Sequence, residues 1–202
     1  MKNISKILLA FISLFLMVGC GNMMNTPTKK VEEFLSKYQT LDKDVLDQLD
    51  DVIDDNESFT DEQRDKYHEL MKNQYKNLSY KIKDETEDGD NATVIAEIEV
   101  LDYGKAISMA DAYLATHREE FLLDKNTPTD NNNDDTTKDN NTAATDTVID
   151  KVKYLTYKIK QMASTKDKVT YTINFNLTKV DGKWKLNDLS DIDILKLHGL
   201  YY

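Results

Sequence analysis

The chain has 202 residues, of which 40% are hydrophobic, and its formal net charge at neutral pH is −11. This acidic balance excludes nucleic acid as an expected partner and repels anionic lipid head groups. The single cysteine excludes an intrachain disulfide and a cysteine-based zinc site, so an apolar core must stabilise the fold. We expect no cofactor and no metal.

The first twenty residues have the three parts of a secretory signal. Lys2 and Lys6 precede an apolar stretch at 7–18, and Gly19 and Cys20 follow it. The apolar stretch would span roughly 18 Å as a helix, whereas the hydrocarbon core of a bilayer is roughly 30 Å thick. The segment is therefore not expected to be a stable membrane span.

The sequence Met17-Val18-Gly19-Cys20, preceded by Leu16, resembles the lipobox of bacterial lipoproteins. The resemblance implies cleavage before Cys20 and transfer of a diacylglyceryl group to its sulfur. Residues 1–19 are then a signal peptide and 20–25 a lipidated tether. Acyl chains such as palmitate would hold the protein on the extracytoplasmic face of the cell membrane. The alternative is an ordinary signal peptide with an incidental cysteine.

The stretch after the tether predicts three helices. Thr26 and Pro27 supply an N-cap and a first helical residue, and a capping box at 60–63 begins the third helix. A short, acidic second helix is expected on the surface at 41–52. The residues at helical spacing are Val31, Phe34, Leu35 and Tyr38, then Leu41, Val45, Leu49 and Val52, then Tyr67, Leu70, Met71, Gln74 and Leu78.

The hydrophobic period then changes from 3.6 to 2, which is typical of strands. Residues 78–83 predict a half-buried strand, and 84–90 an acidic loop. Residues 92–100 predict a longer strand whose even-numbered side chains point inward. Asp84, Thr86 and the residues after them echo the start of a calcium-binding loop, but the closing Glu is missing, so a solvated turn is favoured.

A helical pair is predicted to follow, with a floppy connector. The helical period returns at 104–121 and again at 148–162. The intervening segment 124–146 consists almost entirely of Asp, Asn, Thr and Lys. Such a segment cannot bury enough apolar area to offset the entropy of ordering it, so we expect a disordered loop.

The last part of the chain has the strongest strand signal. Residues 169–177 alternate, and Asp181-Gly182 is typical of a type I′ hairpin turn. Folding about that turn pairs Lys179 with Trp184, so the apolar faces meet and Trp184 is expected in the core. The apolar tail from 189 onward is expected to form either a helix turn or an edge segment.

Four strands with segregated helices predict an α+β fold. We expect one domain at 26–202, with a curved, cone-like antiparallel sheet, helices on one face and an inserted helical pair.

Three short stretches resemble small Gram-positive lipoproteins with a nuclear-transport-factor-two-like, or cystatin-like, domain. They are 26–35, 89–94 and 181–186. The resemblance implies a helix-lined sheet that forms a cone. Members of that superfamily include isomerases, dehydratases and non-catalytic binding modules, so the fold alone does not select a function.

Three side chains are candidates for ligand binding. Tyr80 and Tyr171 are expected to point inward from their strands, and His117 lies on the apolar face of a predicted helix. A lone histidine there is more often a packed residue than a base. An isomerase-like site needs an acid or base inside the cone, and no Asp or Glu falls on the inward face of the predicted strands.

The expected function is that of a non-catalytic, membrane-anchored extracytoplasmic lipoprotein that binds an envelope protein or a small apolar ligand. One alternative is a cone-fold enzyme of the isomerase or dehydratase type whose acid–base residues are unidentified. The other is a structural accessory protein of the envelope. A deep apolar pocket favours a small ligand, and a filled cone beside an exposed apolar patch favours a protein partner.

Overall fold

The computed structural model describes residues 25–54, 59–123 and 148–202. The predictions of a signal peptide at 1–19, of lipidation at Cys20 and of a disordered loop at 124–146 lie outside the described residues.

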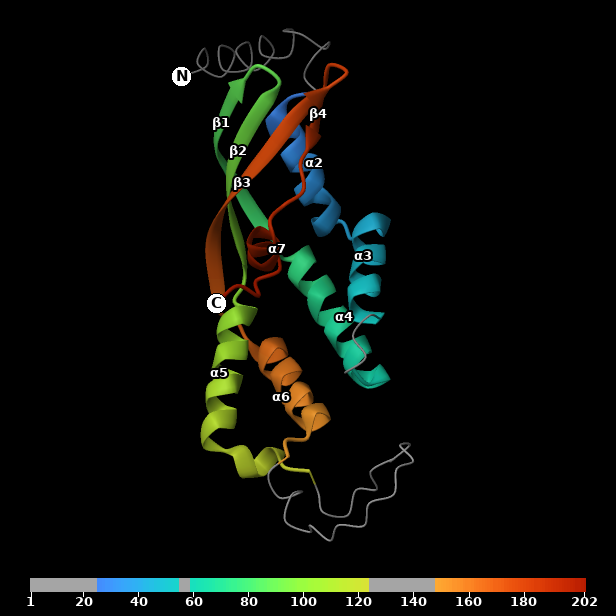
Figure 1. The fold of residues 1–202 in the computed structure, drawn as a ribbon, viewed down its shortest axis with the longest axis vertical. Coiled ribbons are helices and arrows are strands. Elements are labelled where there is room, and N and C mark those ends of the chain that lie inside the picture. The colour runs from blue at the N-terminus through green and yellow to red at the C-terminus, as the bar shows by residue number, and fades with distance from the viewer. Residues whose placement is uncertain (1–24, 55–58, 124–147) are drawn as a thin grey trace, which may run out of the picture. The chain divides into compact units, whose positions relative to one another are not determined.

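The described chain is α+β, as predicted, and its four strands form one antiparallel sheet that is not closed into a barrel (Figure 1). The strand order is β1-β2-β3-β4. The strands are β1 (Ser79–Asp88), β2 (Asn91–Leu101), β3 (Lys168–Val180) and β4 (Lys183–Leu186). The helices are α2 (Pro27–Gln39), α3 (Lys43–Asp54), α4 (Asp61–Lys76), α5 (Tyr103–Thr116), α6 (Lys151–Ser164) and α7 (Asp191–Leu197), with a short 3-10 helix η1 (Arg118–Phe121). Helices α5 and α6 form the predicted insertion between β2 and β3.

The described residues divide into two compact units. Unit 1 contains 25–36, 81–97 and 172–189, and unit 2 contains 37–80, 98–171 and 190–202. The expectation of a single domain at 26–202 stays a prediction.

In unit 1, α2 packs on the sheet. Thr26 caps the helix as predicted, because its Oγ1 accepts a hydrogen bond of 3.1 Å from Lys29 N. Phe34 meets Phe175 of β3 edge to face, with ring centroids 6.0 Å apart. The buried side chains of this unit are Pro27, Val31, Leu35, Ala92, Val94, Ala96, Ile173, Phe175, Leu177 and Trp184. The period-2 alternation of β2 and β3 therefore gives the inward face that the sequence predicted.

The β3–β4 hairpin has the predicted register, with Lys179 opposite Trp184. Asp181 and Gly182 both have positive φ, of 51° and 73°, as a type I′ turn requires. Trp184 is 3% exposed, and Lys179 Nζ lies 4.5 Å from the centroid of its ring. The Asn25 side chain donates to Gly182 O at 2.8 Å and accepts from Trp184 N at 3.0 Å. Trp184 is thus a core residue of this hairpin, as expected.

The acidic loop predicted at 84–90 is wrong for most of its length. Strand β1 continues through this segment to Asp88, and only Gly89 and Asp90 form the turn. Gly89 has φ +60°, a region that glycine enters without steric penalty. The carboxylates stay exposed because β1 is an edge strand, where charged side chains are compatible with pairing on one side only.

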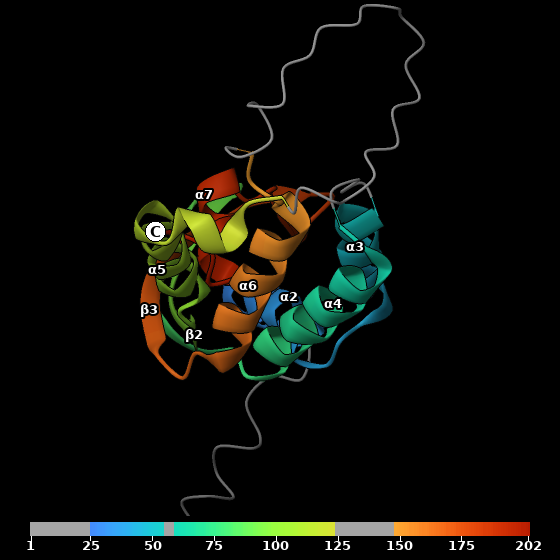
Figure 2. The same cartoon turned by 90° about the horizontal axis from the view of Figure 1, so that it is seen from below.

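In unit 2, the predicted capping box is present at the start of α4. Thr60 Oγ1 accepts from Gln63 N at 3.3 Å, and Gln63 Oε1 accepts from Thr60 N at 3.0 Å. The apolar tail is the helix α7 and not an edge segment, and Ser190 caps it through Asp193 N. Helices α4 and α6 lie next to each other in two perpendicular views (Figures 1 and 2).

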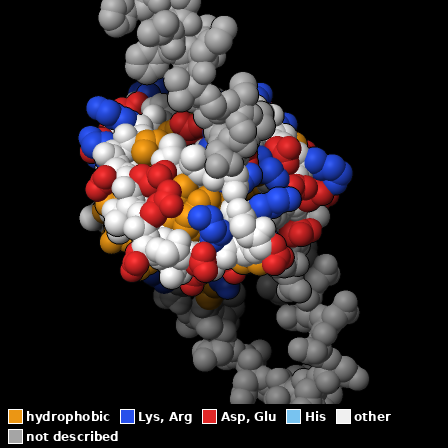
Figure 3. All heavy atoms as spheres, turned by 90° about the horizontal axis from the view of Figure 1, so that it is seen from above, with side chains coloured by type: hydrophobic (Ala, Val, Ile, Leu, Met, Phe, Trp, Pro, Cys, Tyr) orange, Lys and Arg blue, Asp and Glu red, His pale blue; other side chains and the backbone are white. Residues whose placement is uncertain are grey.

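The face of the molecule seen from above carries acidic and basic side chains close together, with small hydrophobic areas between them (Figure 3). Ion pairs at one-turn spacing occur along α2, such as Lys29–Glu32 and Lys30–Glu33. On this face, basic side chains therefore lie among the acidic ones, although the chain as a whole is acidic.

Candidate ligand-binding pocket

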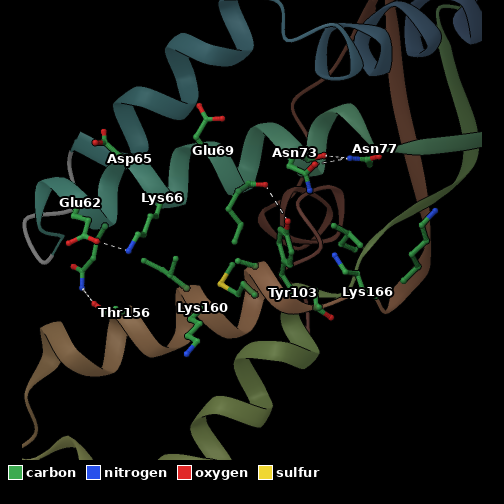
Figure 4. Close-up of a pocket in the computed structure, with 18 residues that line it drawn as sticks. Glu62, Asp65, Lys66, Glu69, Asn73, Asn77, Tyr103, Thr156, Lys160 and Lys166 are labelled. Atoms are coloured by element: carbon green, nitrogen blue, oxygen red, sulfur yellow. Dashed lines mark hydrogen bonds and ion pairs between the residues drawn. The ribbon is translucent and has the colours of Figure 1, made fainter.

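Unit 2 contains a pocket of about 910 Å³ between α4 and α6, here called the α4–α6 pocket (Figure 4). This volume lies in the upper part of the roughly 300–1,000 Å³ range of small-molecule sites. Most of the lining surface is apolar. The apolar lining residues are Leu70, Leu101, Tyr103, Ile159, Met162 and Ala163. Polar and charged side chains of α4, of α6 and of the start of β3 surround them.

Gln63 ties the first turn of α4 to α6. Besides its role in the capping box, its Nε2 donates to Val152 O and to Thr156 Oγ1, each at 2.8 Å. Gln63 is 2% exposed, and both bonds are part-buried. A buried side chain with two such bonds is costly to displace, and it sets the spacing of the two helices at this end of the pocket.

Gln74 fixes the last turn of α4. Its Nε2 donates to Leu101 O at 2.8 Å and to His198 O at 2.9 Å, and its Oε1 accepts from Leu101 N at 3.0 Å. The side chain is 0% exposed. The amide therefore satisfies the backbone N–H and C=O of Leu101, as a neighbouring strand would at the end of β2. It also holds Leu101, which lines the pocket, against α4.

Gly199 makes this arrangement possible. Its φ is +69°, and a Cβ on it would lie 2.2 Å from both Gln74 Nε2 and Leu101 O. Its carbonyl also accepts from Gly104 N, at 2.7 Å, in the first turn of α5. Only a glycine leaves room for the amide of Gln74 between the two chain segments.

Tyr103 closes the floor of the α4–α6 pocket. Its hydroxyl donates to Leu70 O at 3.2 Å, which joins the start of α5 to the middle of α4. Burial raises the pKa of the Tyr103 hydroxyl to about 12, so the group is neutral at physiological pH. This residue adds an apolar ring and no charge to the floor.

Several rim charges of the pocket are already paired. Lys66 donates to Glu62 at 2.6 Å and Lys72 donates to Glu69 at 2.7 Å, and these hydrogen bonds hold the pKa of both carboxyls below their usual range. Both carboxyls are exposed and ionised at neutral pH. A general acid needs the opposite shift, so neither residue has the character of one.

His198 is the most perturbed histidine in the described chain, and it does not line the pocket. Its ring packs against Tyr38 and Tyr75, and Tyr75 Oη lies 3.3 Å from its Nε2. Burial lowers the pKa of His198 to about 4, so the ring is neutral at pH 7. Its position supports the C-terminal end of α7 beside Gln74.

The three side chains predicted to bind ligand lie at separate places, and none of them lines the α4–α6 pocket. Tyr80 is half-buried near the start of β1. Tyr171 on β3 donates to Tyr201 O at 2.8 Å. His117 follows α5 as its C-cap, and its ring stacks on Tyr113 with centroids 3.9 Å apart. Their role in binding stays a prediction.

The described residues hold no cluster of three His, Cys, Asp or Glu side chains that could bind a metal ion. No histidine lines the pocket. The chemistry that the pocket offers is therefore apolar contact on its floor and exposed charges and amides on its rim.

Sequence reasoning missed the pocket because its walls come from segments far apart in the chain. The apolar spacing placed Leu70 on the buried face of α4, and Ile159 and Met162 on that of α6, which is correct. Nothing in that spacing shows that the two faces leave a space between them. The one signal pointing to an unusual contact was a glutamine, Gln74, on an otherwise apolar face.

We predict that Gly199→Ala destabilises unit 2 by about 3 kcal/mol or more. About 1 kcal/mol is the cost of a left-handed backbone, and the rest comes from the overlap with Gln74 and Leu101. Gly89→Ala is the matched control, because Gly89 has a similar φ with nothing within 4 Å of its Cβ position. Urea denaturation followed by far-UV circular dichroism measures both, and equal losses would contradict the account of Gly199.

Comparison of the chain with protein-family models, with curated proteins and with solved structures found no match to any of them. Within the described ranges, none of the helices has the length and apolar character needed to cross a membrane.

Proposed function

We propose that this protein is a non-catalytic lipoprotein, anchored on the extracytoplasmic face of the membrane, that binds a small apolar ligand in the α4–α6 pocket. The observation that carries the proposal is the apolar floor of a pocket of about 910 Å³. Apolar surface in contact with water is unfavourable by roughly 25 cal/mol per Å², so a ligand gains affinity by covering the part of the apolar lining that water reaches. Leu70, Ile159 and Met162 themselves are only 6%, 3% and 3% exposed.

The lining supports binding more than catalysis. Its carboxylates, Glu62, Asp65 and Glu69, are exposed, and the pKa shifts resolved for Glu62 and Glu69 are downward. Tyr103 is neutral, and its hydroxyl already donates to a backbone carbonyl. An isomerase-type mechanism needs a base or acid whose pKa is tuned towards neutrality next to the reacting atoms, which Glu62, Glu69 and Tyr103 do not supply.

The alternative of a protein partner rests on one other feature. Ile192, Ile194 and Leu195 of α7 are 52%, 39% and 40% exposed, so this helix presents apolar side chains to solvent. Three exposed apolar residues on a seven-residue helix still form a small surface, whereas stable protein interfaces bury roughly 800 Å² on each partner. The pocket is the stronger candidate site.

The anchoring half of the proposal rests on the lipobox-like residues that end at Cys20. With a net charge of −11, the chain has no electrostatic attraction to an anionic membrane surface, so residence there requires acyl chains.

We predict that the protein extracted from membranes has the mass expected after cleavage before Cys20 plus a diacylglyceryl group. The Cys20→Ala variant should lack that group. Intact mass spectrometry of both proteins is the measurement. A wild-type mass without lipid would refute the anchor and leave the pocket argument untouched.

We predict that Ala163→Trp blocks the α4–α6 pocket. Ala163 lines the pocket and is exposed, so a large side chain there occupies the space without entering the core. N-phenyl-1-naphthylamine, a neutral apolar fluorophore, should bind the wild type and bind Ala163→Trp at least tenfold more weakly.

Ser164→Trp is the matched control for that variant. Ser164 is the next residue of α6, is exposed and does not line the pocket. Probe binding should be retained in this variant. If both tryptophan variants bind the probe like the wild type, or if the wild type does not bind it, the proposed binding function is wrong.

A further inference from the structure

The charge of the α4–α6 pocket differs from that of the chain. Its lining contains four lysines, at 66, 160, 166 and 168, and three acids, at 62, 65 and 69, which gives a formal charge of 4 − 3 = +1. The whole chain has −11. This count alone does not favour an anionic ligand, which depends on whether an unpaired lysine lies at the apolar floor.

Two of these lysines are already engaged. Lys66 pairs with Glu62 at 2.6 Å, and Lys168 pairs with Glu99 at 2.7 Å. Within the described ranges, Lys160 and Lys166 form no ion pair. These two lysines are the cations of the lining that a ligand can use without breaking an existing pair.

The positions of the two free lysines differ. Figure 4 shows Lys160 directed away from the other lining side chains, on the outer side of α6. In the same view Lys166 lies towards the end of the pocket where Tyr103, Asn73 and Asn77 are drawn, and Glu62 lies towards the other end. Lys166 is therefore the free cation at one end of the apolar floor.

The amides at that end add hydrogen-bonding capacity. Asn77 Nδ2 donates to Asn73 O at 2.8 Å and to Asn73 Oδ1 at 3.0 Å, which orients the two side chains together. Both residues are exposed at the rim. Both hydrogens of Asn77 Nδ2 are used in these bonds, so a ligand carboxylate placed there meets the Lys166 cation and the Asn73 amide while staying in contact with water.

We propose that the ligand of the α4–α6 pocket is a long-chain fatty acid, an inference that rests on the proposed function. Its alkyl chain covers Leu70, Ile159 and Met162, and its carboxylate lies at the rim beside Lys166. A carboxylate carries a single negative charge, which one free ammonium matches. A phosphate monoester carries nearly two, and Lys168 is already paired with Glu99.

The two parts of the ligand contribute differently to affinity. Each methylene buried on the floor strengthens binding by about fourfold. Lys166 is exposed, so its ion pair with a carboxylate is screened and changes the Kd by only about two- to fivefold. The chain length thus determines how tightly the ligand binds, and Lys166 determines the preference for an acid over an uncharged analogue.

The test is displacement of N-phenyl-1-naphthylamine from the full chain carrying Cys20→Ala, which removes the proposed acylation. The competitors are palmitic acid, the uncharged cetyl alcohol of equal chain length, the shorter lauric acid and lysophosphatidic acid, all below their aggregation limits. We expect palmitic acid to bind more tightly than cetyl alcohol, and lauric acid to bind more weakly by about fourfold per missing methylene.

Lys166→Gln should weaken palmitic acid about two- to fivefold and leave cetyl alcohol unchanged. Lys160→Gln is the matched control, because it removes the same charge from a side chain that is directed away from the pocket. It should leave the binding of both ligands unchanged. Added salt should reduce the preference for the acid in the parent protein and not in Lys166→Gln.

Equal affinity for palmitic acid and cetyl alcohol, or equal effects of Lys166→Gln and Lys160→Gln, would overturn the inference. Tighter binding of lysophosphatidic acid than of palmitic acid would overturn the choice of a carboxylate. If the fluorophore binds but no competitor displaces it, the fatty-acid inference fails and the proposed function stands. If the fluorophore does not bind, both fail.

Discussion

The amide of Gln74 is the constraint on which the architecture of unit 2 depends. It is fully buried, and it makes three hydrogen bonds, two to Leu101 and one to the carbonyl of His198. A buried amide left without partners costs about 1–3 kcal/mol for each unsatisfied group, so α4, the end of β2 and the end of α7 must meet in one arrangement. Gly199 is required there because any side chain would occupy the space of that amide.

The same constraint explains how unit 2 keeps an open pocket next to a packed core. Gln63 at the first turn of α4 is bonded to α6, and Gln74 at the last turn is bonded to β2 and α7. With α4 held at both ends, Leu70 and Tyr103 in between are linked by one hydrogen bond, and the remaining space towards α6 is the α4–α6 pocket. A preformed apolar cavity of this kind needs little reorganisation to take a ligand.

Charge has a secondary role in this arrangement. The rim acids of α4 at 62 and 69 are neutralised by lysines on the same helix, which reduces their repulsion of an anionic ligand. Lys166, which forms no ion pair within the described part of the chain, lies on a different segment, after α6. The apolar floor is complementary to an alkyl chain, and Lys166 at one end of it is complementary to an anionic head group.

Much of the fold could be predicted from the sequence because local rules govern it. The register that pairs Lys179 with Trp184 follows from turn chemistry and period-2 alternation, and the start of α4 follows from its capping box. Residues 84–88 were predicted wrongly as part of a loop, because composition does not show that an edge strand can keep its carboxylates in water.

The candidate site could not be predicted in this way. The pocket depends on the separation of α4 and α6, which the long-range bonds of Gln63 and Gln74 determine. Tyr80, Tyr171 and His117 were chosen from local patterns, and the structure places them away from the pocket lining. Periodicity identifies which face of a helix is buried, but not how far that face lies from the next one.

The most direct test of the account is a methyl-resolved NMR titration of the full chain with N-phenyl-1-naphthylamine. The account predicts that the largest shift changes occur at the methyl groups of Leu70, Ile159 and Met162, with little change at Ile192 and Leu195 of α7. Shift changes concentrated on α7, with the α4–α6 pocket unaffected, would contradict it and favour an exposed docking surface instead.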